Sequence, residues 1–511
     1  MRRKKMFLAA APLAALLPLV LTSVAQTAPA EAATSSSCAA VSVPAPAGAR
    51  IESVQAAAKP AKADVPAYCE ITVTLTHGSA GDHVKVAVAL PLTGWTGRLQ
   101  AVGGSAYTAG DFGAPLVQAV KDGYSGVTTD AGVPLTFLDT SWALTDNGEI
   151  NKPLVTNFAT RSVHEAAVIG KDVTRKFYQR AVSYSYWNGC STGGRQGYSE
   201  AQRYPGDFDG VLANAPAVHW AEFAVATLWP QVVMNQDKTF PSDCVFSAFR
   251  QAAIEACDGR DGVTDGIVDR PDECGYDPRS LIGTKVHCGD EEVVVTAADA
   301  EVVRKIWAGP TDEHGRRLWP GLPKSAEFGP VTNAPGFPVA LGWVRTFLKK
   351  QPGFDASKIT YRQFAELFRQ SVREYDDVIG TSDPDLSDFR RAGGKLITFV
   401  GTDDQLIPPG GTLRYRHEVE RELGGPKRVN EFYRLFFAPG VTHCAGGAGA
   451  APTNALGALV DWVEHGKAPS TLPAANGDKT LTRDLCPYPQ VSRYRGHGDP
   501  AVATSYRCAA H

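Results

Sequence analysis

The 511-residue sequence lacks several features that mark common protein classes. None of its ten cysteines forms a Cys-x-x-Cys pair, the spacing used by many zinc sites and dithiol redox centres. The formal net charge is −3, and basic residues are not clustered with aromatic ones, so no surface is suited to nucleic acid. Beyond the N-terminal region no segment is long and apolar enough to span a bilayer, and no internal repeat is present.

The N-terminal residues have the pattern of an export signal. Basic residues open the chain, an apolar run covers residues 6–24, and small residues follow. Two prolines interrupt the run, which disfavours a transmembrane anchor. We therefore expect residues 1–33 to be a signal peptide, cleaved after Ala25 or after Ala33, and the mature protein to be soluble and extracellular.

Composition predicts a folded protein of more than one domain. A chain of 511 residues with 43% hydrophobic content can bury a large core. An even number of cysteines fits disulfide bonding in an oxidising compartment. The Ala-, Pro- and Ser-rich residues 34–60 form the one low-complexity stretch, and we interpret them as a flexible lead into the folded chain.

A candidate nucleophile lies in Gly189-Cys190-Ser191-Thr192-Gly193, which matches Gly-x-Ser-x-Gly. In that motif a strand turns sharply into a helix and leaves the serine hydroxyl exposed. Residues 182–187 are β-prone and residues 195–203 have a helical pattern, so the required context is present. A Gly- and Ser-rich turn also matches by chance, so the motif alone leaves a purely structural turn open.

Two later segments supply the partners that a serine nucleophile needs. Residues 395–401 predict a buried strand that ends beside Asp403 and Asp404. His443 follows the β-prone residues 430–437, in a loop. An imidazole that a carboxylate holds in one tautomer can take the serine proton, and the order serine, aspartate, histidine is that of an α/β-hydrolase. Paired aspartates are also common turn formers and helix caps, and spacing does not choose between these two.

Taken jointly, Cys190-Ser191, Asp404 and His443-Cys444 resemble the CS-D-HC pattern of the tannase and feruloyl esterase family. A Gly-x-x-Asp-x-x-Ile-Pro-like segment of the family matches residues 401–408 and selects Asp404 over its neighbour. The similarity extends from about residue 69 to the C-terminus. It implies the α/β class, with an α/β-hydrolase core and a large inserted lid domain.

The resemblance also implies a function. We expect a secreted serine carboxylic ester hydrolase that cleaves aromatic esters, hydroxycinnamoyl, galloyl or related phenolic conjugates, through an acyl-enzyme. The substrate would be a small molecule or an aromatic ester of the plant cell wall. The alternatives are a peptidase or acyl transferase that uses the same triad, and an inactive secreted carbohydrate-binding protein.

Disulfide pairing is a further implication of the resemblance. A Cys190–Cys444 bridge would hold the residues beside the serine and the histidine together. The other expected pairs are Cys38–Cys69, Cys257–Cys274 and Cys486–Cys508. Cys244–Cys288 is then expected because these are the two cysteines left over.

An oxyanion hole needs at least two donors. The backbone N–H of Thr192, the residue after the nucleophile, is the first expected donor. Residues 103–105 resemble the Gly-rich loop of the family, so Gly103 or Gly104 is the second candidate. The alternative is a tight turn with no catalytic part.

The chain between Ser191 and Asp404 is longer than a hydrolase core requires. We predict a lid domain over residues 219–384, inserted into a catalytic domain of residues 61–218 and 385–511. Some lid side chains are candidates for stacking on an aromatic acyl group, although lid packing is the alternative: Trp307, Trp319, Phe337, Trp343 and Phe347. Arg345 and Arg373 are candidates for binding a carboxylate or phenol on the acyl part of the substrate. The alternative is that both lie on a solvated surface.

A short Asp- and Gly-rich loop follows Cys257 in the predicted lid. Its carboxylates and backbone carbonyls are hard oxygen ligands that suit Ca²⁺, although the spacing departs from an EF-hand and a metal-free turn is the alternative. The resemblance implies a structural Ca²⁺. Its ligands would be the side chains or carbonyls of Asp258, Asp261, Val263, Asp265 and Ile267.

Overall fold

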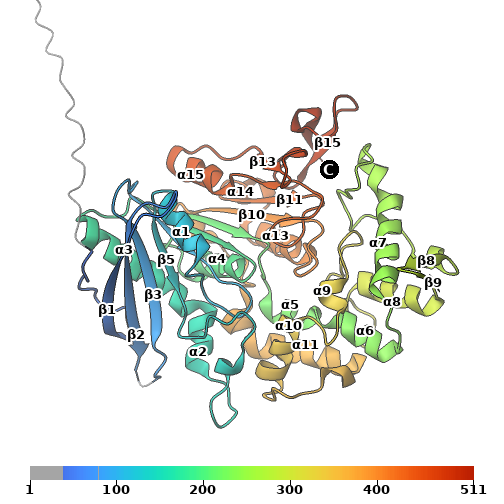
Figure 1. The fold of residues 1–511 in the computed structure, drawn as a ribbon, viewed down its shortest axis with the longest axis horizontal. Coiled ribbons are helices and arrows are strands. Elements are labelled where there is room, and N and C mark those ends of the chain that lie inside the picture. The colour runs from blue at the N-terminus through green and yellow to red at the C-terminus, as the bar shows by residue number, and fades with distance from the viewer. Residues whose placement is uncertain (1–37, 79, 511) are drawn as a thin grey trace, which may run out of the picture.

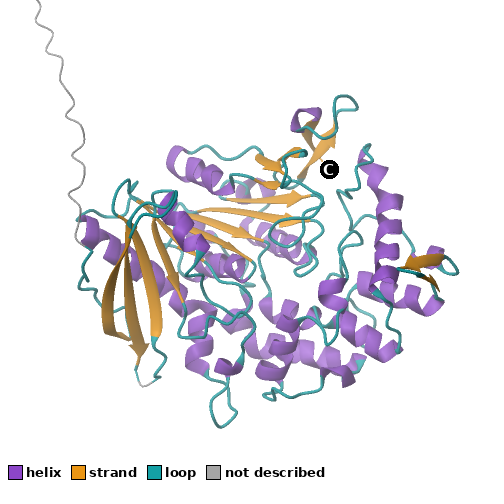
Figure 2. Cartoon of the chain, in the orientation of Figure 1, coloured by secondary structure: helices purple, strands orange, loops and turns teal. Residues whose placement is uncertain are grey.

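The computed structural model describes residues 38–510, except residue 79. A twisted sheet runs through the centre, with helices on both sides and a helical region along the lower and right-hand parts of the view (Figures 1 and 2). The signal peptide predicted for residues 1–33 lies outside the described residues. None of the described helices has the length and apolar character needed to cross a membrane.

The central sheet has nine strands in the order β1-β2-β3-β5-β4-β6-β7-β10-β11. The pairs from β1 to β5 are antiparallel, and those from β5 to β11 are parallel. Its strands are β1 (Ala49–Lys59), β2 (Tyr68–His77), β3 (Val84–Pro91), β4 (Arg98–Val102), β5 (Ser125–Thr129), β6 (Tyr184–Cys190), β7 (Gly210–Asn214), β10 (Lys395–Gly401) and β11 (Tyr433–Ala438).

Small antiparallel sheets complete the strands. One of them, β8 with β9, lies in the helical region, and the others follow β11 near the C-terminus. Their strands are β8 (Lys285–Cys288), β9 (Glu291–Val294), β12 (Ala451–Pro452), β13 (Leu472–Ala475), β14 (Thr482–Leu485), β15 (Gln490–Tyr494) and β16 (Tyr506–Ala510).

Helices cover both faces of the central sheet. Apolar residues of α3, α4 and α13 pack with the strands into one core, and α15 packs into another with the opposite face. The helices are α1 (Ala114–Lys121), α2 (Lys152–Thr156), α3 (Ser162–Tyr178), α4 (Thr192–Arg203), α5 (Trp220–Ala226), α6 (Trp229–Asp237), α7 (Asp243–Cys257), α8 (Ala297–Ala308), α9 (Gly329–Thr332), α10 (Pro338–Gly342), α11 (Tyr361–Tyr375), α12 (Ser387–Arg391), α13 (Gly410–Leu423), α14 (Pro426–Val429) and α15 (Ala455–His465).

The chain between β7 and β10, residues 215–394, is here named the inserted segment. It contains α5 to α12 and the β8–β9 hairpin, and most of its buried apolar residues belong to a third core. That core also includes Tyr107 and Trp142, so the inserted segment packs directly on the loops that follow β4 and β5. The boundaries at 219 and 384 stay a prediction based on composition.

The flexible lead predicted for residues 34–60 is wrong over its second half. Residues 49–59 form β1, the edge strand, which pairs in antiparallel fashion with β2. Ile51, Val54 and Ala56 of β1 pack at the margin of the core beneath the sheet. The alanine-rich composition masked this strand, because an edge strand buries only half of its side chains and tolerates small residues.

The strands and helices predicted around the motifs exist, with shifted ends. The strand predicted at 395–401 is β10, and the helix predicted at 195–203 is α4, which begins three residues earlier. The β-prone residues 430–432 precede β11, because α14 and its C-cap end at Asn430. Residues 451–452 form β12, and α15 begins at Ala455.

Every cysteine is paired, and the pairs are those that the sequence analysis expects. The bridges are Cys38–Cys69, Cys190–Cys444, Cys244–Cys288, Cys257–Cys274 and Cys486–Cys508. The last of these ties the C-terminal strand β16 to the residue that follows β14.

A substitution at Leu396 tests how much the apolar packing of β10 contributes to stability, since this side chain is fully buried in a strand that is paired on both sides. Leu396→Ala removes buried methyl groups and leaves a cavity, so we expect the free energy of unfolding to fall by about 2–5 kcal/mol. Denaturant unfolding measures this loss. Leu135→Ala, at a side chain that is 54% exposed, is the matched control and is expected to change stability by about 0.5 kcal/mol or less.

Candidate active site

The candidate catalytic residues follow strands of the parallel part of the sheet. Ser191 comes directly after β6, Asp404 follows β10, and His443 follows β11. Because parallel strands end at the same edge of a sheet, their carboxyl-terminal loops meet there. Ser191 and His443 line one cavity at this edge.

The turn at Ser191 is strained and tightly packed. The serine has φ 63° and ψ −121°, a backbone conformation that L residues rarely adopt. Its N–H donates to the carbonyl of Asn214, 3.0 Å away. A Cβ atom at Gly189 would lie 2.6 Å from the backbone of Gly193, so the motif glycine permits the close approach of strand and helix.

Asp404 and His443 form a hydrogen-bonded pair. Asp404 Oδ2 lies 2.8 Å from His443 Nδ1. The Asp404 side chain is fully buried, and its other oxygen accepts the N–H groups of Leu406 and Ile407 at 3.0 and 2.8 Å. The carboxylate is therefore fixed on both sides, and it can hold the imidazole with its second nitrogen available to a hydroxyl.

The neighbouring aspartate points elsewhere. Asp403 Oδ1 accepts a hydrogen bond from the Ser325 hydroxyl of the inserted segment at 2.5 Å. Burial raises the pKa of Asp403, and the Ser325 hydrogen bond opposes that change. The structure thus gives the two adjacent carboxylates different partners, and only Asp404 contacts the histidine.

Two further contacts hold the histidine loop. The Cys190–Cys444 disulfide brings the Cα atoms of these residues to 6.0 Å, so Ser191 and His443 each adjoin one half of a covalent link. The backbone N–H of His443 donates to Gln405 Oε1 at 3.2 Å. Gln405 was not among the predicted site residues, although it lies beside Asp404 in the segment that selected the aspartate.

The predicted oxyanion donors are only partly available. The N–H of Gly103 donates to the carbonyl of Asn188 at 3.2 Å, and that of Gly104 donates to Gln196 Oε1 at 3.0 Å. These glycines instead allow close packing, since a Cβ at Gly104 would lie 2.0 Å from the carbonyl oxygen of Thr108. The tight-turn alternative therefore describes their part in the structure.

The next residues of that loop reach the cavity. Ser105 and Ala106 line it together with Thr192. The Thr192 hydroxyl donates to the carbonyl of Ala106 at 2.7 Å, so the two backbones are adjacent. Among the described residues, no acceptor is recorded for the N–H of Thr192 or of Ala106. These two groups are the candidates for binding an oxyanion.

The cavity has a mainly apolar lining. Its polar side chains are one imidazole and three hydroxyls, and among the residues that the structure describes no Lys, Arg, Asp or Glu lines it. The lining residues are Ser105, Ala106, Phe137, Leu138, Ser191, Thr192, Ala217, Trp220, Phe223, Phe337, Pro338, Val339, Leu406, Ile407 and His443.

Of the aromatic residues predicted to stack on a substrate, only Phe337 lines this cavity. Trp343 and Phe347 are buried in the core beneath it, where Trp343 stacks on Phe347 with 4.3 Å between ring centroids. Neither predicted arginine lines the cavity. Arg345 Nε donates to the carbonyl of Phe354, and the Arg373 side chain is 68% exposed.

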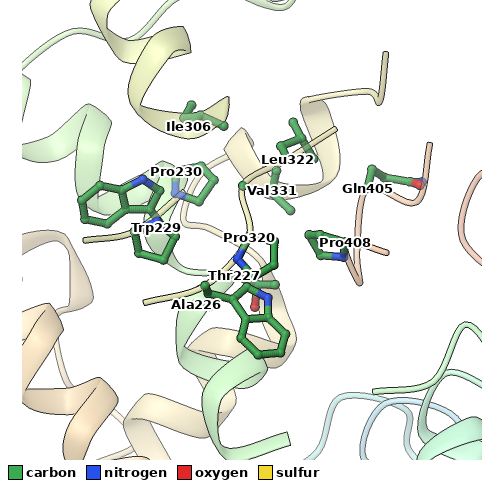
Figure 3. A pocket seen from close by; sticks show the side chains of 13 residues that line it. Ala226, Thr227, Trp229, Pro230, Ile306, Pro320, Leu322, Val331, Gln405 and Pro408 are labelled. Carbon is green, nitrogen blue, oxygen red and sulfur yellow. The ribbon is translucent and has the colours of Figure 1, made fainter. Parts of the chain in front are cut away.

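A second, smaller cavity borders the aspartate loop. Figure 3 shows Gln405 and Pro408 of that loop together with side chains of the inserted segment, among them Trp229 and Leu322. Trp319 also lines it, and Trp307 packs against Phe328. Gln405 and Pro408 thus face this second cavity, whereas Leu406 and Ile407, which lie between them in the sequence, line the first.

The predicted calcium loop begins with a short 3₁₀ helix, Asp258–Asp261. Asp258 accepts the N–H groups of Asp265 and Gly266, and Asp265 Oδ2 lies 2.9 Å from Arg483 Nη2. Within the described part of the chain, no three His, Cys, Asp or Glu side chains form a group able to hold a metal ion. The Ca²⁺ ligand set stays a prediction.

The central sheet, the turn at Ser191 and the ordered loops after β6, β10 and β11 define a protein of the α/β-hydrolase class. The sequence profile described as "Tannase and feruloyl esterase" matches residues 69–509. The chain belongs to this family of carboxylic ester hydrolases, as the resemblance predicted.

Individual relatives agree with the family assignment. A probable feruloyl esterase of Arthroderma benhamiae is 48% identical over 460 residues, or 86% of this chain and 85% of that protein. Among solved structures, tannin acyl hydrolase from Aspergillus niger has a TM-score of 0.82 and 27% identity, with 91% of this chain and 92% of that one covered. Feruloyl esterase B from Aspergillus oryzae has a TM-score of 0.78 and 26% identity, with 91% and 97% covered.

The adjacent aspartates provide a matched pair of variants. Asp404→Asn removes the charge that holds His443, so we expect kcat for p-nitrophenyl butyrate to fall on the order of 10³- to 10⁴-fold. Asp403→Asn leaves the histidine contact intact, and we expect it to keep kcat within about tenfold while the free energy of unfolding falls by about 1–3 kcal/mol. Steady-state kinetics and denaturant unfolding test both. Equal kinetic losses would contradict the assignment of Asp404.

Proposed function

We propose that this protein hydrolyses phenolic carboxylic esters with Ser191 as nucleophile, His443 as general base and Asp404 as the residue that orients the imidazole. The observation that carries the proposal is the Asp404–His443 hydrogen bond of 2.8 Å, at a cavity that Ser191 also lines. Nucleophile, base and orienting carboxylate are the parts that acyl transfer needs.

The reaction follows from these positions. His443 takes the proton of the Ser191 hydroxyl while the serine oxygen forms a bond to the ester carbonyl carbon. The N–H groups of Thr192 and Ala106 donate hydrogen bonds to the negative charge that develops on the carbonyl oxygen. Collapse breaks the bond to the alcohol, which leaves with the proton from His443. Water then gives a proton to the imidazole and attacks the carbonyl carbon of the acyl-enzyme. The bond to the serine oxygen breaks, that oxygen takes the proton back from His443, and the acid is released.

The substrate class rests on relatives and on the cavity. Relatives carry the names feruloyl esterase and tannin acyl hydrolase, which supports a hydroxycinnamoyl or galloyl ester, as a small molecule or in plant cell-wall material. The cavity is mainly apolar and has Phe137, Trp220 and Phe337 in its lining, which suits an aromatic acyl group.

The proposed function is tested with methyl ferulate, methyl gallate and a peptide amide as substrates. We expect turnover of at least one phenolic ester, and Ser191→Ala is expected to lower it about a thousandfold or more because the nucleophile is lost. Product release measured by chromatography gives the rates. Amide cleavage without ester cleavage, or undiminished ester hydrolysis by Ser191→Ala, would contradict the proposal.

We also propose that the loop after Cys257 holds a structural Ca²⁺. Its carboxylates and carbonyls suit this ion chemically. Burial is the largest cause that raises the pKa of Asp261, of Asp265 and of Asp269, the last to about 7. Nearby carboxylates add to the rise, and Arg483 opposes it at Asp265 and Asp269. A bound cation would offset both the burial of these charges and their mutual repulsion. The ion would act on folding, with no part in the ester chemistry.

Removal of the ion is the test. Treatment with EGTA is expected to lower the melting temperature, and Ca²⁺ to restore it, with a stabilisation of about 3 kcal/mol at a hundredfold excess over Kd. Asp261→Asn is expected to abolish this response. The control Asp272→Asn, at a side chain 66% exposed in the same region, is expected to retain it. A melting temperature insensitive to EGTA, with no metal found by elemental analysis, would refute this site.

We propose that the mature protein is extracellular. Five disulfides use all ten cysteines, which is the usage expected in an oxidising compartment. The predicted signal peptide supports the same location.

A further inference from the structure

An exposed apolar loop borders the cavity beside Ser191. Most large apolar side chains of the described residues are buried, but Leu135, Phe137 and Leu138 are 54%, 52% and 42% exposed within one short loop. Phe137 and Leu138 also line the cavity, whereas Leu135 does not. Single exposed apolar residues are ordinary, but several at the rim of a cavity indicate a surface that a ligand covers.

Backbone contacts fix this loop against the proposed oxyanion donors. The carbonyl of Phe137 accepts the N–H of Tyr107 at 3.1 Å, and Tyr107 directly follows Ala106. The Tyr107 side chain is buried and its hydroxyl donates to the carbonyl of Val339 at 2.7 Å. At the far end of the loop, the Trp142 indole donates to the carbonyl of Asp139 at 2.8 Å. Phe137 and Leu138 are thus held beside the reacting centre.

The rest of the lining offers little to a charged or strongly polar group. Besides His443, its polar side chains are Ser105, Ser191 and Thr192, and the Thr192 hydroxyl already donates to a carbonyl. The predicted cations Arg345 and Arg373 lie elsewhere. A carboxylate placed here would lose water without gaining a counter-ion, which is a large cost.

We propose that Phe137 and Leu138 form the wall that contacts the aromatic ring of the substrate, and that this cavity selects uncharged aromatic acids over acids that carry a second carboxylate. The proposal rests on the ester hydrolysis proposed at Ser191 and specifies its substrate. Esters of cinnamic and ferulic acid satisfy it. A trihydroxy acid such as gallic acid should be intermediate, because its hydroxyls find few partners.

The first experiment truncates the wall. Phe137→Ala is expected to lower kcat/KM for methyl ferulate about tenfold or more, because the ring loses its contact surface. Vinyl acetate, which carries no ring, should be hydrolysed within about twofold of the original rate, since it does not reach the wall. Leu138→Ala should have a smaller effect of the same kind.

Two matched controls separate contact from loop damage. Phe240→Ala removes an equally large side chain that is 61% exposed and does not line the cavity, and Leu135→Ala alters the same loop outside it. Both are expected to leave the two rates unchanged. A loss on methyl ferulate in either control equal to that of Phe137→Ala, or an equal loss on vinyl acetate, would overturn the assignment of the wall.

The second experiment tests charge. Monomethyl terephthalate, an aromatic half-ester with a free carboxylate, is expected to have a kcat/KM at least about a hundredfold below that of methyl cinnamate. Leu138→Arg places a cation at the wall and should narrow this ratio about tenfold or more. Equal use of the two esters by the unaltered protein would overturn the selectivity.

A binding measurement distinguishes failure of the wall assignment from failure of the proposed ester hydrolysis. Binding of methyl ferulate to Ser191→Ala, followed by calorimetry, needs no turnover, and Phe137→Ala in that background should raise Kd about tenfold. If no ester is hydrolysed but this shift is found, the wall stands and the catalytic proposal fails. If esters are hydrolysed and neither kcat/KM nor Kd responds to Phe137→Ala, the wall is refuted and the catalytic proposal stands.

Discussion

The Cys190–Cys444 disulfide is the constraint on which the candidate active site depends. It joins residues separated by 254 positions, and on the chain-entropy model a loop of this size contributes about 5 kcal/mol of stability. The position of the disulfide matters more than this stabilisation, because each cysteine is adjacent to one of the two residues between which a proton must pass. Ser191 and Cys444 both have positive φ values, 63° and 65°, so the link joins two turns of unusual backbone conformation.

The parallel strands supply the second part of this arrangement. β6, β10 and β11 end at one edge of the sheet, and the residues after them form the site. The inserted segment closes the cavity from the other side with Trp220, Phe223 and Phe337. The catalytic residues therefore follow strands of the sheet, while the rest of the lining comes both from the inserted segment and from the loops after β4 and β5.

The sequence allowed the local features to be predicted. Residues 395–401 are mostly apolar and rich in β-branched and aromatic residues, and β10 has these bounds. Asp404 could be distinguished from Asp403 only through the family pattern, because both aspartates occupy the same turn and their partners, His443 and Ser325, lie far away in sequence.

Features that depend on distant contacts escaped prediction. Nothing in residues 135–138 indicates that they meet the loop after β4, since the contact runs through the carbonyl of Phe137. The glycines at 103 and 104 had the residue type of an oxyanion loop, but their N–H groups are taken by Asn188 and Gln196. The edge strand β1 was not predicted for a related reason. Its alternation of apolar and polar residues is weak, and the segment is a strand because it pairs with β2.

Asp403 and Asp404 give one short backbone segment two attachments. One carboxylate holds the imidazole, and the other receives the Ser325 hydroxyl from the inserted segment. The turn that positions the histidine is therefore joined to the inserted segment directly beside the Asp404 contact. A change in the inserted segment that removes the Ser325 hydroxyl would leave the buried Asp403 carboxylate without this donor, at a cost of about 1–3 kcal/mol in stability.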